Sequence, residues 1–370
     1  MSKAAELAAL IGTGASTSKR NMLMNGDMRV SQRNGTSAVT VSASAGAYTL
    51  DRWQLYTNSG NYSVQQITDT TLPSGFLNAA KITVSSVGNT SGSGNAVHFE
   101  QKIEANNISH LNWGGGNAGT ARTCTLSFFV KSSVTGTYSV HFGNDNDRFY
   151  VSTYAISSAD TWEKKTITVT GPTDGTWNTG TGRGLEIVWV LLQGSGGTTS
   201  SLNQWISTSQ TFASTSTTQW GTNSGATFFL TGCQFEIAGV AQPFEHESYG
   251  DNLARCQRYA LRVPSLAGTA TYGAISNGYA YDNNTALTAI PLPVEMRAIP
   301  AVTKLGSLRA FNPANDDTDI SGIAIDSVRT NPSTCYIDCS TTDTNLTAGE
   351  GVIISRDNDA DGGILISAEL

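Results

Sequence analysis

Residues 185–193 read LEIVWVLLQ and residues 124–132 read CTLSFFVKS, and these two stretches decide the fold. Both contain apolar side chains at successive positions, in the segments IVWVLL and SFFV. A short run of this kind, bounded by turn residues, is typical of a strand that is covered on both faces. The sequence therefore predicts two central strands of a larger sheet structure.

Further strand-like runs surround these two between residues 21 and 248. In one of them, Lys81, Thr83 and Ser85 alternate with Ile82 and Val84. This alternation indicates one solvent-exposed face and one buried face. Clusters of Gly, Asn, Asp and Ser separate the runs, with no helical pattern between them, so we predict a jelly-roll β-sandwich over residues 21–245. The other runs are DRWQLY, NYSVQQI, AKITVSS, AVHFEQKIE, YSVHF, RFYVSTYAI, KKTITVT and ATFFLTGCQFEI.

The pattern changes at residues 246–263, HESYGDNLARCQRYALRV. Apolar residues recur there at helical spacing, basic residues follow an acidic start, and Pro264 closes the run. We predict one linking helix over residues 246–264. About eight short strand-like runs follow, so residues 265–370 are predicted to form a smaller β-sandwich or barrel, and the whole chain belongs to the all-β class.

The first residues differ from the rest. SKAAELAALI at residues 2–11 places apolar side chains at helical spacing, and the flexible segment GTGASTSK follows it. We therefore expect residues 1–20 to form a short N-terminal helix and a linker. A helix this short is marginal in water unless it docks against the chain, a sister copy or a larger assembly. The alternative is a frayed terminus.

Composition excludes several classes of protein. The chain has 22 basic and 29 acidic residues, a net charge of -7 and no Lys/Arg run, so we expect no nucleic-acid partner. No apolar stretch approaches the roughly 20 residues of a membrane span, which predicts no membrane insertion. The N-terminus does not read as a secretory signal, so synthesis in a cytoplasm is expected. The five scattered cysteines are expected to be reduced, with Cys335 and Cys339 as buried fillers on one strand face.

No catalytic motif stands out. The four histidines are isolated, and neither a nucleophile elbow nor a phosphate-binding loop is present. We also find no favoured pair of carboxylates, so we expect no enzymatic activity and no cofactor. One weak exception is Asp357, Asp359 and Asp361 before Gly362, the first half of a calcium loop without its closing Glu. A polar hairpin turn is the alternative reading of that segment.

The tryptophans suggest a ligand. An aromatic ring can stack on the C–H face of a sugar while neighbouring polar side chains bind its hydroxyls. Trp53, Trp162 and Trp189 lie within strand patterns and are predicted to be core residues. The other four tryptophans lie among polar loop residues and are our glycan-binding candidates, with loop anchoring as the alternative: Trp113, Trp177, Trp205 and Trp220.

Four stretches resemble a recurrent family of bacteriophage and prophage virion structural proteins, usually described as tail-fibre-like or collar proteins. They are NMLMNGDMRVSQRNGT (21–36), LDRWQLY (50–56), TGCQFEIAGVAQPFEHESYGDNLARCQRYA (231–260) and PLPVEMRAIPAVT (291–303). The resemblance implies a carbohydrate-binding-module-like jelly roll and a second β domain, mostly as a homotrimer. It also implies assembly in the host cytoplasm with other phage virion proteins, and a place on the virion. The residue types in these stretches indicate structural roles. One example is Asp51 and Arg52, whose opposite charges could form a buried pair.

From these observations our leading hypothesis is a non-enzymatic fibre or tail-associated adhesin. Its N-terminus would dock on the particle through Leu7, Leu10 and Ile11, and its β domains would bind a host-surface glycan. Two alternatives stay open. One is a capsid decoration or head-fibre protein, and the other is a polysaccharide-degrading tailspike, which needs two carboxylates about 5 to 9.5 Å apart.

Overall fold

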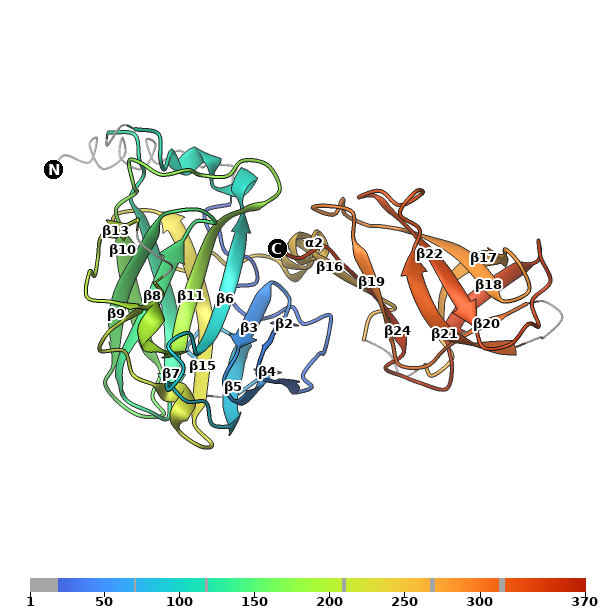
Figure 1. Ribbon diagram of the computed structural model, residues 1–370, viewed down its shortest axis with the longest axis horizontal. Coiled ribbons are helices and arrows are strands. Elements are labelled where there is room, and N and C mark those ends of the chain that lie inside the picture. The colour runs from blue at the N-terminus through green and yellow to red at the C-terminus, as the bar shows by residue number, and fades with distance from the viewer. Residues whose placement is uncertain (1–18, 70, 117–118, 208–210, 267–269, 313–316) are drawn as a thin grey trace.

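The computed structural model describes residues 19–69, 71–116, 119–207, 211–266, 270–312 and 317–370. Nearly all of its regular structure is β (Figure 1), so the predicted all-β class is confirmed. The predicted helix at residues 2–11, with Leu7, Leu10 and Ile11, lies outside the described residues. Within the described part of the chain, no helix is both long enough and apolar enough to span a bilayer.

Two antiparallel sheets form the N-terminal sandwich. The first has the strand order β1 (Val39–Val41), β4 (Asn61–Ile67), β5 (Ala79–Ser86), β15 (Thr227–Ile237), β7 (Cys124–Ser132), β10 (Glu163–Val169). The second has the order β13 (Trp205–Ile206), β9 (Phe149–Ile156), β8 (Gly136–Gly143), β11 (Arg183–Gln193), β6 (Ala96–Glu104), β3 (Trp53–Thr57), β2 (Ala45–Leu50). All ten strand-like runs predicted between residues 21 and 248 contribute strands, as the jelly-roll prediction requires.

Aromatic side chains fill the space between the sheets. Trp53 stacks on Phe99 at 5.2 Å between ring centroids, and Trp189 lies 5.4 Å from both Trp53 and Phe128. Trp53 and Trp189 are fully buried, as their strand patterns predict. Trp162 differs from its prediction, because it is half-buried and Lys131 lies over its ring.

Short elements complete the sandwich. The described part of its connections contains four 3-10 helices: η1 (Ala105–Asn107), η2 (Ser109–Leu111), η3 (Ser195–Gly197) and η4 (Trp220–Thr222). The segment after β11 also contains a parallel pair, β12 (Thr198–Thr199) with β14 (Ala213–Ser214). This segment lies over β8, since Ser214 N donates to Ser139 Oγ at 3.0 Å and His141 Nδ1 lies 2.8 Å from the Thr211 carbonyl oxygen.

The linking helix is shorter than predicted. Helix α2 spans Tyr249–Gln257, and the side chain of Ser248 caps it by accepting from Asp251 N at 3.1 Å. Residues 260–263 are instead strand β16 (Ala260–Val263), which pairs with β24 (Gly363–Ser367). Pairing with a distant strand overrides the helical spacing, because a ladder of backbone hydrogen bonds and a buried Leu261 are gained there.

The C-terminal unit combines a small sheet and a closed barrel. The sheet has the order β16, β24, β19 (Ala301–Leu305). The barrel runs β17 (Ala274–Ala280), β18 (Thr285–Pro291), β22 (Thr334–Thr341), β21 (Asp317–Ile325), β20 (Leu308–Phe311), β23 (Gly351–Arg356). Cys335 and Cys339 are free and buried on one face of β22, as predicted.

The stretches that carry the family resemblance meet at one buried junction. Residues 21–30 lie along β15, where Met22 N donates to the Phe235 carbonyl at 2.9 Å and Cys233 N donates to the Gly26 carbonyl at 2.9 Å. A Cβ at Gly26 would lie 2.1 Å from the Cys233 oxygen, so only glycine fits. Asn252 of α2 contacts the same segment, since it donates to Asp27 at 3.1 Å. These residues hold the helix on the sandwich.

The end of the chain returns to the jelly roll. Arg52 does not pair with Asp51, as the sequence suggested, but with Glu369. Glu104 at the end of β6 accepts from Arg258 at 2.7 Å and from the Tyr259 hydroxyl at 2.8 Å. Buried polar contacts therefore join the two units.

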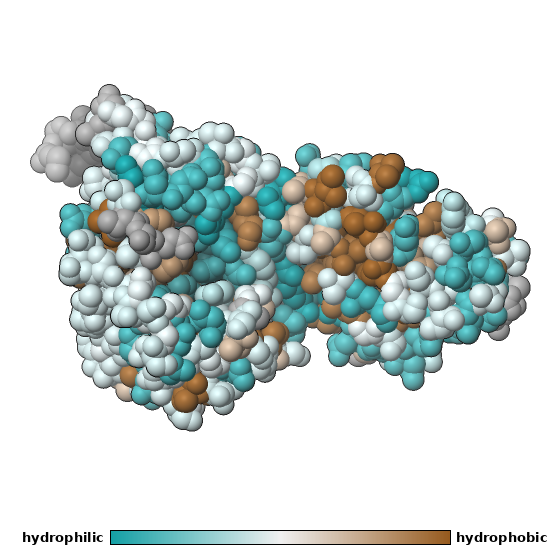
Figure 2. Space-filling view, in the orientation of Figure 1, coloured by the Kyte–Doolittle hydropathy of each residue, from teal (hydrophilic) through white to brown (hydrophobic). Residues whose placement is uncertain are grey.

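The visible surface differs between the units. Figure 2 shows a mostly polar jelly roll and apolar side chains gathered on the C-terminal unit. The face of the jelly roll seen in Figure 2 therefore carries few strongly apolar side chains.

Candidate functional site

Polar side chains gather on the outer face of the seven-stranded sheet. Tyr56 of β3 lies directly opposite His98 of β6, and Lys102 of β6 lies directly opposite Glu186 of β11. Residues opposite each other share one face of a sheet, and so do residues two apart on one strand. Glu100, between His98 and Lys102, therefore faces the same way. The strand register alone brings these five side chains together.

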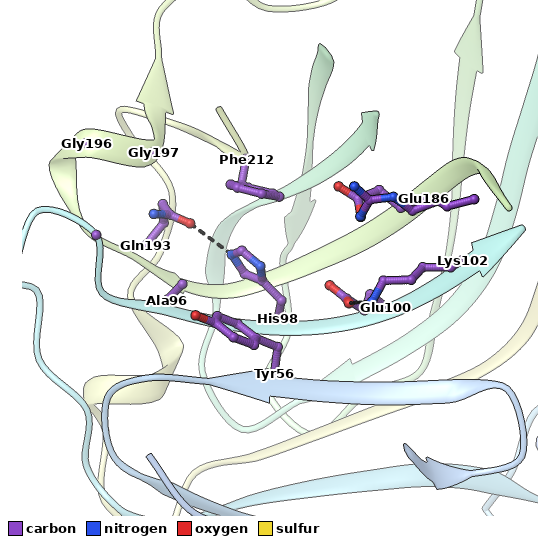
Figure 3. Close-up of a pocket in the computed structure, with 12 residues that line it drawn as sticks. Tyr56, Ala96, His98, Glu100, Lys102, Glu186, Gln193, Gly196, Gly197 and Phe212 are labelled. Atoms are coloured by element: carbon purple, nitrogen blue, oxygen red, sulfur yellow. Dashed lines mark hydrogen bonds and ion pairs between the residues drawn. The ribbon is translucent and has the colours of Figure 1, made fainter. Parts of the chain in front are cut away.

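These residues line a cleft of about 370 Å³, here called the β6–β11 cleft (Figure 3). Its lining is Tyr56, Gly94, Ala96, His98, Glu100, Lys102, Arg183, Glu186, Gln193, Gly196, Gly197 and Phe212. The segment after β11 forms one wall, where Phe212 N donates to the Gly197 carbonyl at 2.8 Å. A Cβ at Gly197 would lie 2.2 Å from the side-chain Nε2 of Gln193. Glycine at this position therefore lets the wall approach the Gln193 side chain closely.

Rings form the apolar part of the cleft. Figure 3 places Tyr56 and Phe212 on opposite sides of His98. The Tyr56 and His98 ring centroids are 5.9 Å apart, and those of His98 and Phe212 are 4.5 Å apart. Phe212 also contacts His141 at 4.7 Å. Tyr56 is 36% exposed, so its ring is open to a ligand.

His98 is a neutral polar group in this wall. Its Nε2 lies 2.9 Å from the Gln193 side-chain oxygen. Burial lowers the pKa of His98 to about 4, although the contact with Gln193 opposes the shift. The imidazole is therefore uncharged at neutral pH, and it can orient a ligand without attracting a counter-ion.

Two buried carboxylates, Glu100 and Glu186, line the cleft at the end where Lys102 lies (Figure 3). Burial, reinforced by the neighbouring Glu186, raises the pKa of Glu100 to about 7, with Lys102 Nζ at 3.2 Å from Glu100 Oε1. Burial also opposes ionisation of Glu186, but contact with His141 and the charge of Arg183 outweigh it and lower the pKa of Glu186. One carboxyl is therefore ionised while the other titrates near neutrality.

Sequence reasoning missed this pair of carboxylates. The available signal was polar residues at alternate positions of AVHFEQKIE, together with one charged residue inside the apolar run LEIVWVLLQ. Neither signal shows by itself that Glu100 and Glu186 lie on neighbouring strands. The antiparallel register of β6 and β11 supplies that information.

Three of the four candidate tryptophans form one cluster, and none of them lines the β6–β11 cleft. Trp113 lies 5.2 Å from Trp177 and 5.3 Å from Trp205, and Trp177 and Trp205 are 5.8 Å apart. Trp177 and Trp205 are half-buried and pack against the sandwich core. Their indole N–H groups donate to the carbonyls of Asp174 and Thr170. Such contacts are what loop anchoring, the alternative reading, requires.

Trp113 and Trp220 are core residues. Trp220 is completely buried and Trp113 is 7% exposed. The Trp113 N–H donates to the Arg122 carbonyl at 2.8 Å, and Trp220 packs on Tyr62 and Phe228. A ring without an open face cannot stack on a sugar, so we withdraw these two as glycan-binding candidates.

The aspartates near the C-terminus make a turn. Asp359 accepts from Ser307 N at 2.8 Å and from Asp361 N at 2.9 Å. No group of three acidic, His or Cys side chains suited to a metal occurs within the described ranges, and this includes Asp357, Asp359 and Asp361. The turn does not close a hairpin either, because β23 belongs to the barrel and β24 to the small sheet.

No family model matches the sequence, and no curated protein matches it. Solved structures with a similar fold include an enzymatically active domain of tailspike protein 4 of bacteriophage CBA120. That similarity has 12% identity and a TM-score of 0.31, and covers 59% of this chain and 21% of the tailspike chain.

Two further solved structures are matched over their whole length. A putative sugar-binding protein from Bacteroides thetaiotaomicron has 14% identity and a TM-score of 0.35, over 59% of this chain and 100% of that one. A family 11 carbohydrate-binding module from Clostridium thermocellum, in complex with a mixed-linked tetrasaccharide, has 10% identity and a TM-score of 0.27, over 56% and 100% of the two chains. At this level of identity, the similarity concerns the fold alone.

Proposed function

We propose that this chain is a glycan-binding protein of a bacteriophage virion, and that the β6–β11 cleft holds the saccharide. The observation that carries the proposal is the cleft itself, in which an open Tyr56 ring and Phe212 flank buried polar side chains. A saccharide offers apolar C–H faces and hydroxyl groups, and this combination of rings and polar groups matches both. A volume of about 370 Å³ lies within the usual range for small-molecule sites.

Each part of the cleft has a role in this proposal. Tyr56 provides a stacking face, and Phe212 closes the opposite side. His98 and Gln193 fix each other through their hydrogen bond, so they present donors and acceptors in a set orientation. Preorganised polar groups lose little conformational entropy when a ligand binds, which favours affinity.

The virion role rests on the resemblance of the four sequence stretches. They lie mainly at the buried junction, while the cleft, apart from Tyr56, lies outside them. Scaffold and recognition are therefore carried by different residues, as an attachment protein requires. We further propose a non-enzymatic homotrimer, assembled in the host cytoplasm, that joins the particle through residues 1–20. Several weak sites on one particle gain avidity of about 10² to 10⁴.

The test is glycan-array binding of the full chain, followed by calorimetry with the strongest glycan. Tyr56→Ala and Phe212→Ala should each weaken binding about tenfold, or about 1.4 kcal/mol. Tyr281→Ala is the matched control, because Tyr281 is an exposed tyrosine of the C-terminal unit. Binding that is unaffected by both cleft variants would contradict the proposal.

One observation favours a second function, hydrolysis of a polysaccharide. Glu100 and Glu186 are diagonal neighbours on β6 and β11, an arrangement with Cα atoms about 7 to 8 Å apart. Two carboxyls whose pKa values are pushed in opposite directions are typical of glycosidase acid and base pairs. The test is release of reducing ends from host polysaccharide, which Glu100→Gln and Glu186→Gln should each abolish while the chain still binds the polysaccharide.

A further inference from the structure

The side-chain amide of Gln193 has one orientation in the wall of the β6–β11 cleft. Its Nε2 donates to two backbone carbonyls, those of Gly194 at 3.4 Å and Asn95 at 3.5 Å, and its Oε1 lies 2.9 Å from His98 Nε2. Exchanging the amide oxygen and nitrogen would place an acceptor against both carbonyl oxygens, where nothing could donate. Gln193 therefore presents an acceptor to His98.

Contacts of the protein itself hold this amide in place. Gln193 N donates to Gln219 Oε1 at 2.9 Å, and Gln219 Nε2 donates back to the Gln193 carbonyl at 3.1 Å. The backbone of Gln193 is thus clamped by the side chain of Gln219. The acceptor that faces His98 is consequently present before any ligand binds.

This acceptor decides which nitrogen of His98 carries the proton. A neutral imidazole has one N–H donor and one nitrogen that accepts. Because Gln193 Oε1 can only accept, the proton of His98 lies on Nε2. Burial lowers the pKa of His98 to about 4, so the ring carries no second proton at neutral pH. Nδ1 is therefore left as an acceptor.

Nδ1 of His98 is available to a ligand. Within the described ranges of the chain, no residue donates a hydrogen bond to it, although His98 lines the cleft. Figure 3 shows this nitrogen turned away from Gln193, towards the end of the cleft where Glu186 and Lys102 lie. Tyr56 is directly opposite His98 on the neighbouring strand, with 5.9 Å between the ring centroids. A sugar ring stacked on Tyr56 would therefore bring the hydroxyls at its edge close to His98.

We propose that His98, held by Gln193 as the Nε2-protonated tautomer, determines the specificity of the cleft by accepting a hydrogen bond at Nδ1 from one hydroxyl of the saccharide. This inference rests on the proposed glycan-binding function of the same cleft. A saccharide without that hydroxyl leaves a largely buried acceptor unpaired, which disfavours its binding. An ether or carbonyl oxygen at the same position is disfavoured too, since two acceptors would meet.

The first test measures the tautomer without a ligand. The full chain is labelled with nitrogen-15 at histidine, and its four histidines give a simple NMR spectrum in which His98→Gln assigns the signals of His98. At neutral pH, Nε2 should resonate as a protonated nitrogen and Nδ1 as an unprotonated one. Gln193→Met removes the acceptor and should allow the Nδ1-protonated tautomer to appear. A proton on Nδ1 in the wild type would overturn the inference and leave glycan binding untouched.

The second test uses calorimetry on the full chain. The probes are cellotetraose, β-1,4-galactotetraose and mannotetraose, each beside its monodeoxy forms. For a tetrasaccharide that binds, loss of one particular hydroxyl should weaken wild-type binding about tenfold and His98→Gln binding less than about twofold, because the variant lacks the imidazole acceptor. His110→Gln is the matched control, an exposed histidine outside the cleft, and should behave as the wild type.

A measurement on the wild type alone covers the case in which His98→Gln binds too weakly. Saturation with the tetrasaccharide should move the Nδ1 signal of His98 towards that of a protonated nitrogen. An unchanged Nδ1 signal, or equal losses of wild type and His98→Gln with every deoxy form, would overturn the inference while glycan binding stands. If none of these probes nor any array glycan binds, the proposed function fails, and this inference with it.

Discussion

Arg52 in the jelly roll and Glu369, the next-to-last residue of the chain, form an ion pair in which both side chains are buried, at 1% and 7% exposure. Arg33 contacts the same carboxylate at 2.9 Å, and the Arg52 guanidinium lies 3.6 Å from the centroid of the Tyr259 ring. The C-terminal unit is therefore tied to the jelly roll by charges that are largely shielded from water.

Glu369→Ala should destabilise the chain strongly. Removing one partner of a buried pair leaves the other charge without compensation, which costs about 3 to 5 kcal/mol. Urea unfolding of the full chain measures this cost. Asp317→Ala is the control, since its pair with Arg309 is partly exposed and should contribute less than about 1 kcal/mol. Equal effects of the two substitutions would contradict this reading of the junction.

Trp220→Ala should also destabilise the jelly roll, by about 3 to 5 kcal/mol, because it removes a completely buried indole and leaves a cavity. Trp177→Ala should cost less than half of that, since Trp177 is only partly buried. Thermal unfolding of the two variants gives the comparison. If Trp220→Ala left stability unchanged and weakened glycan binding, the assignment of Trp220 to the core would be wrong.

Mild acid should destabilise the fold through His98. Its pKa is about 4 in the folded chain and ordinarily 6.5, so the unfolded chain takes up a proton that the folded chain cannot. The contribution of His98 to the free energy of unfolding is therefore fully present above pH 6.5. It is lost as the pH falls towards 4, by about 3 kcal/mol in total. Glu100 acts in the opposite direction, because its raised pKa favours the folded state at low pH.

The measurement is urea unfolding of the wild type and His98→Gln at pH 7.5 and pH 4.5. Both proteins keep Glu100, so the difference between them isolates the imidazole. The wild type should lose more stability than the variant between these pH values. Identical losses in the two proteins would show that His98 is not buried in its neutral form.

Deleting residues 1–18 should leave the fold intact and remove the chain from virions. The described contacts begin with Lys19, which pairs with Glu247 at 2.9 Å, and Arg20, which pairs with Glu236 at 2.9 Å. The deletion keeps both pairs. Unfolding curves and the copy number in purified particles test the two parts of this prediction, and normal incorporation of the shortened chain would contradict the docking role of Leu7, Leu10 and Ile11.

Local pattern was sufficient for most of the fold. Alternation of side chains and dense turn residues predicted the strands of both units, because the period of two is a property of each strand by itself. The end of the linking helix was not predictable in this way. Residues 260–263 fit a helix locally, and only pairing with β24, about a hundred residues later, makes them a strand.

The site was harder to predict than the fold. Tyr56, His98, Glu186 and Phe212 come from distant parts of the sequence, and strand register brings them together. Aromatic residues in polar loops suggested Trp220, but hydrophobic burial took that ring into the core. The sequence shows which side chains are able to contact a sugar, whereas accessibility is decided by packing.

The most direct test of the central claim is a crystal structure of the full chain with the oligosaccharide that binds most tightly in calorimetry. The saccharide should lie in the β6–β11 cleft, with one ring against Tyr56 and a hydroxyl within hydrogen-bonding distance of His98 Nδ1. A saccharide bound instead at Trp177 and Trp205, or on the C-terminal barrel, with an empty β6–β11 cleft, would contradict it.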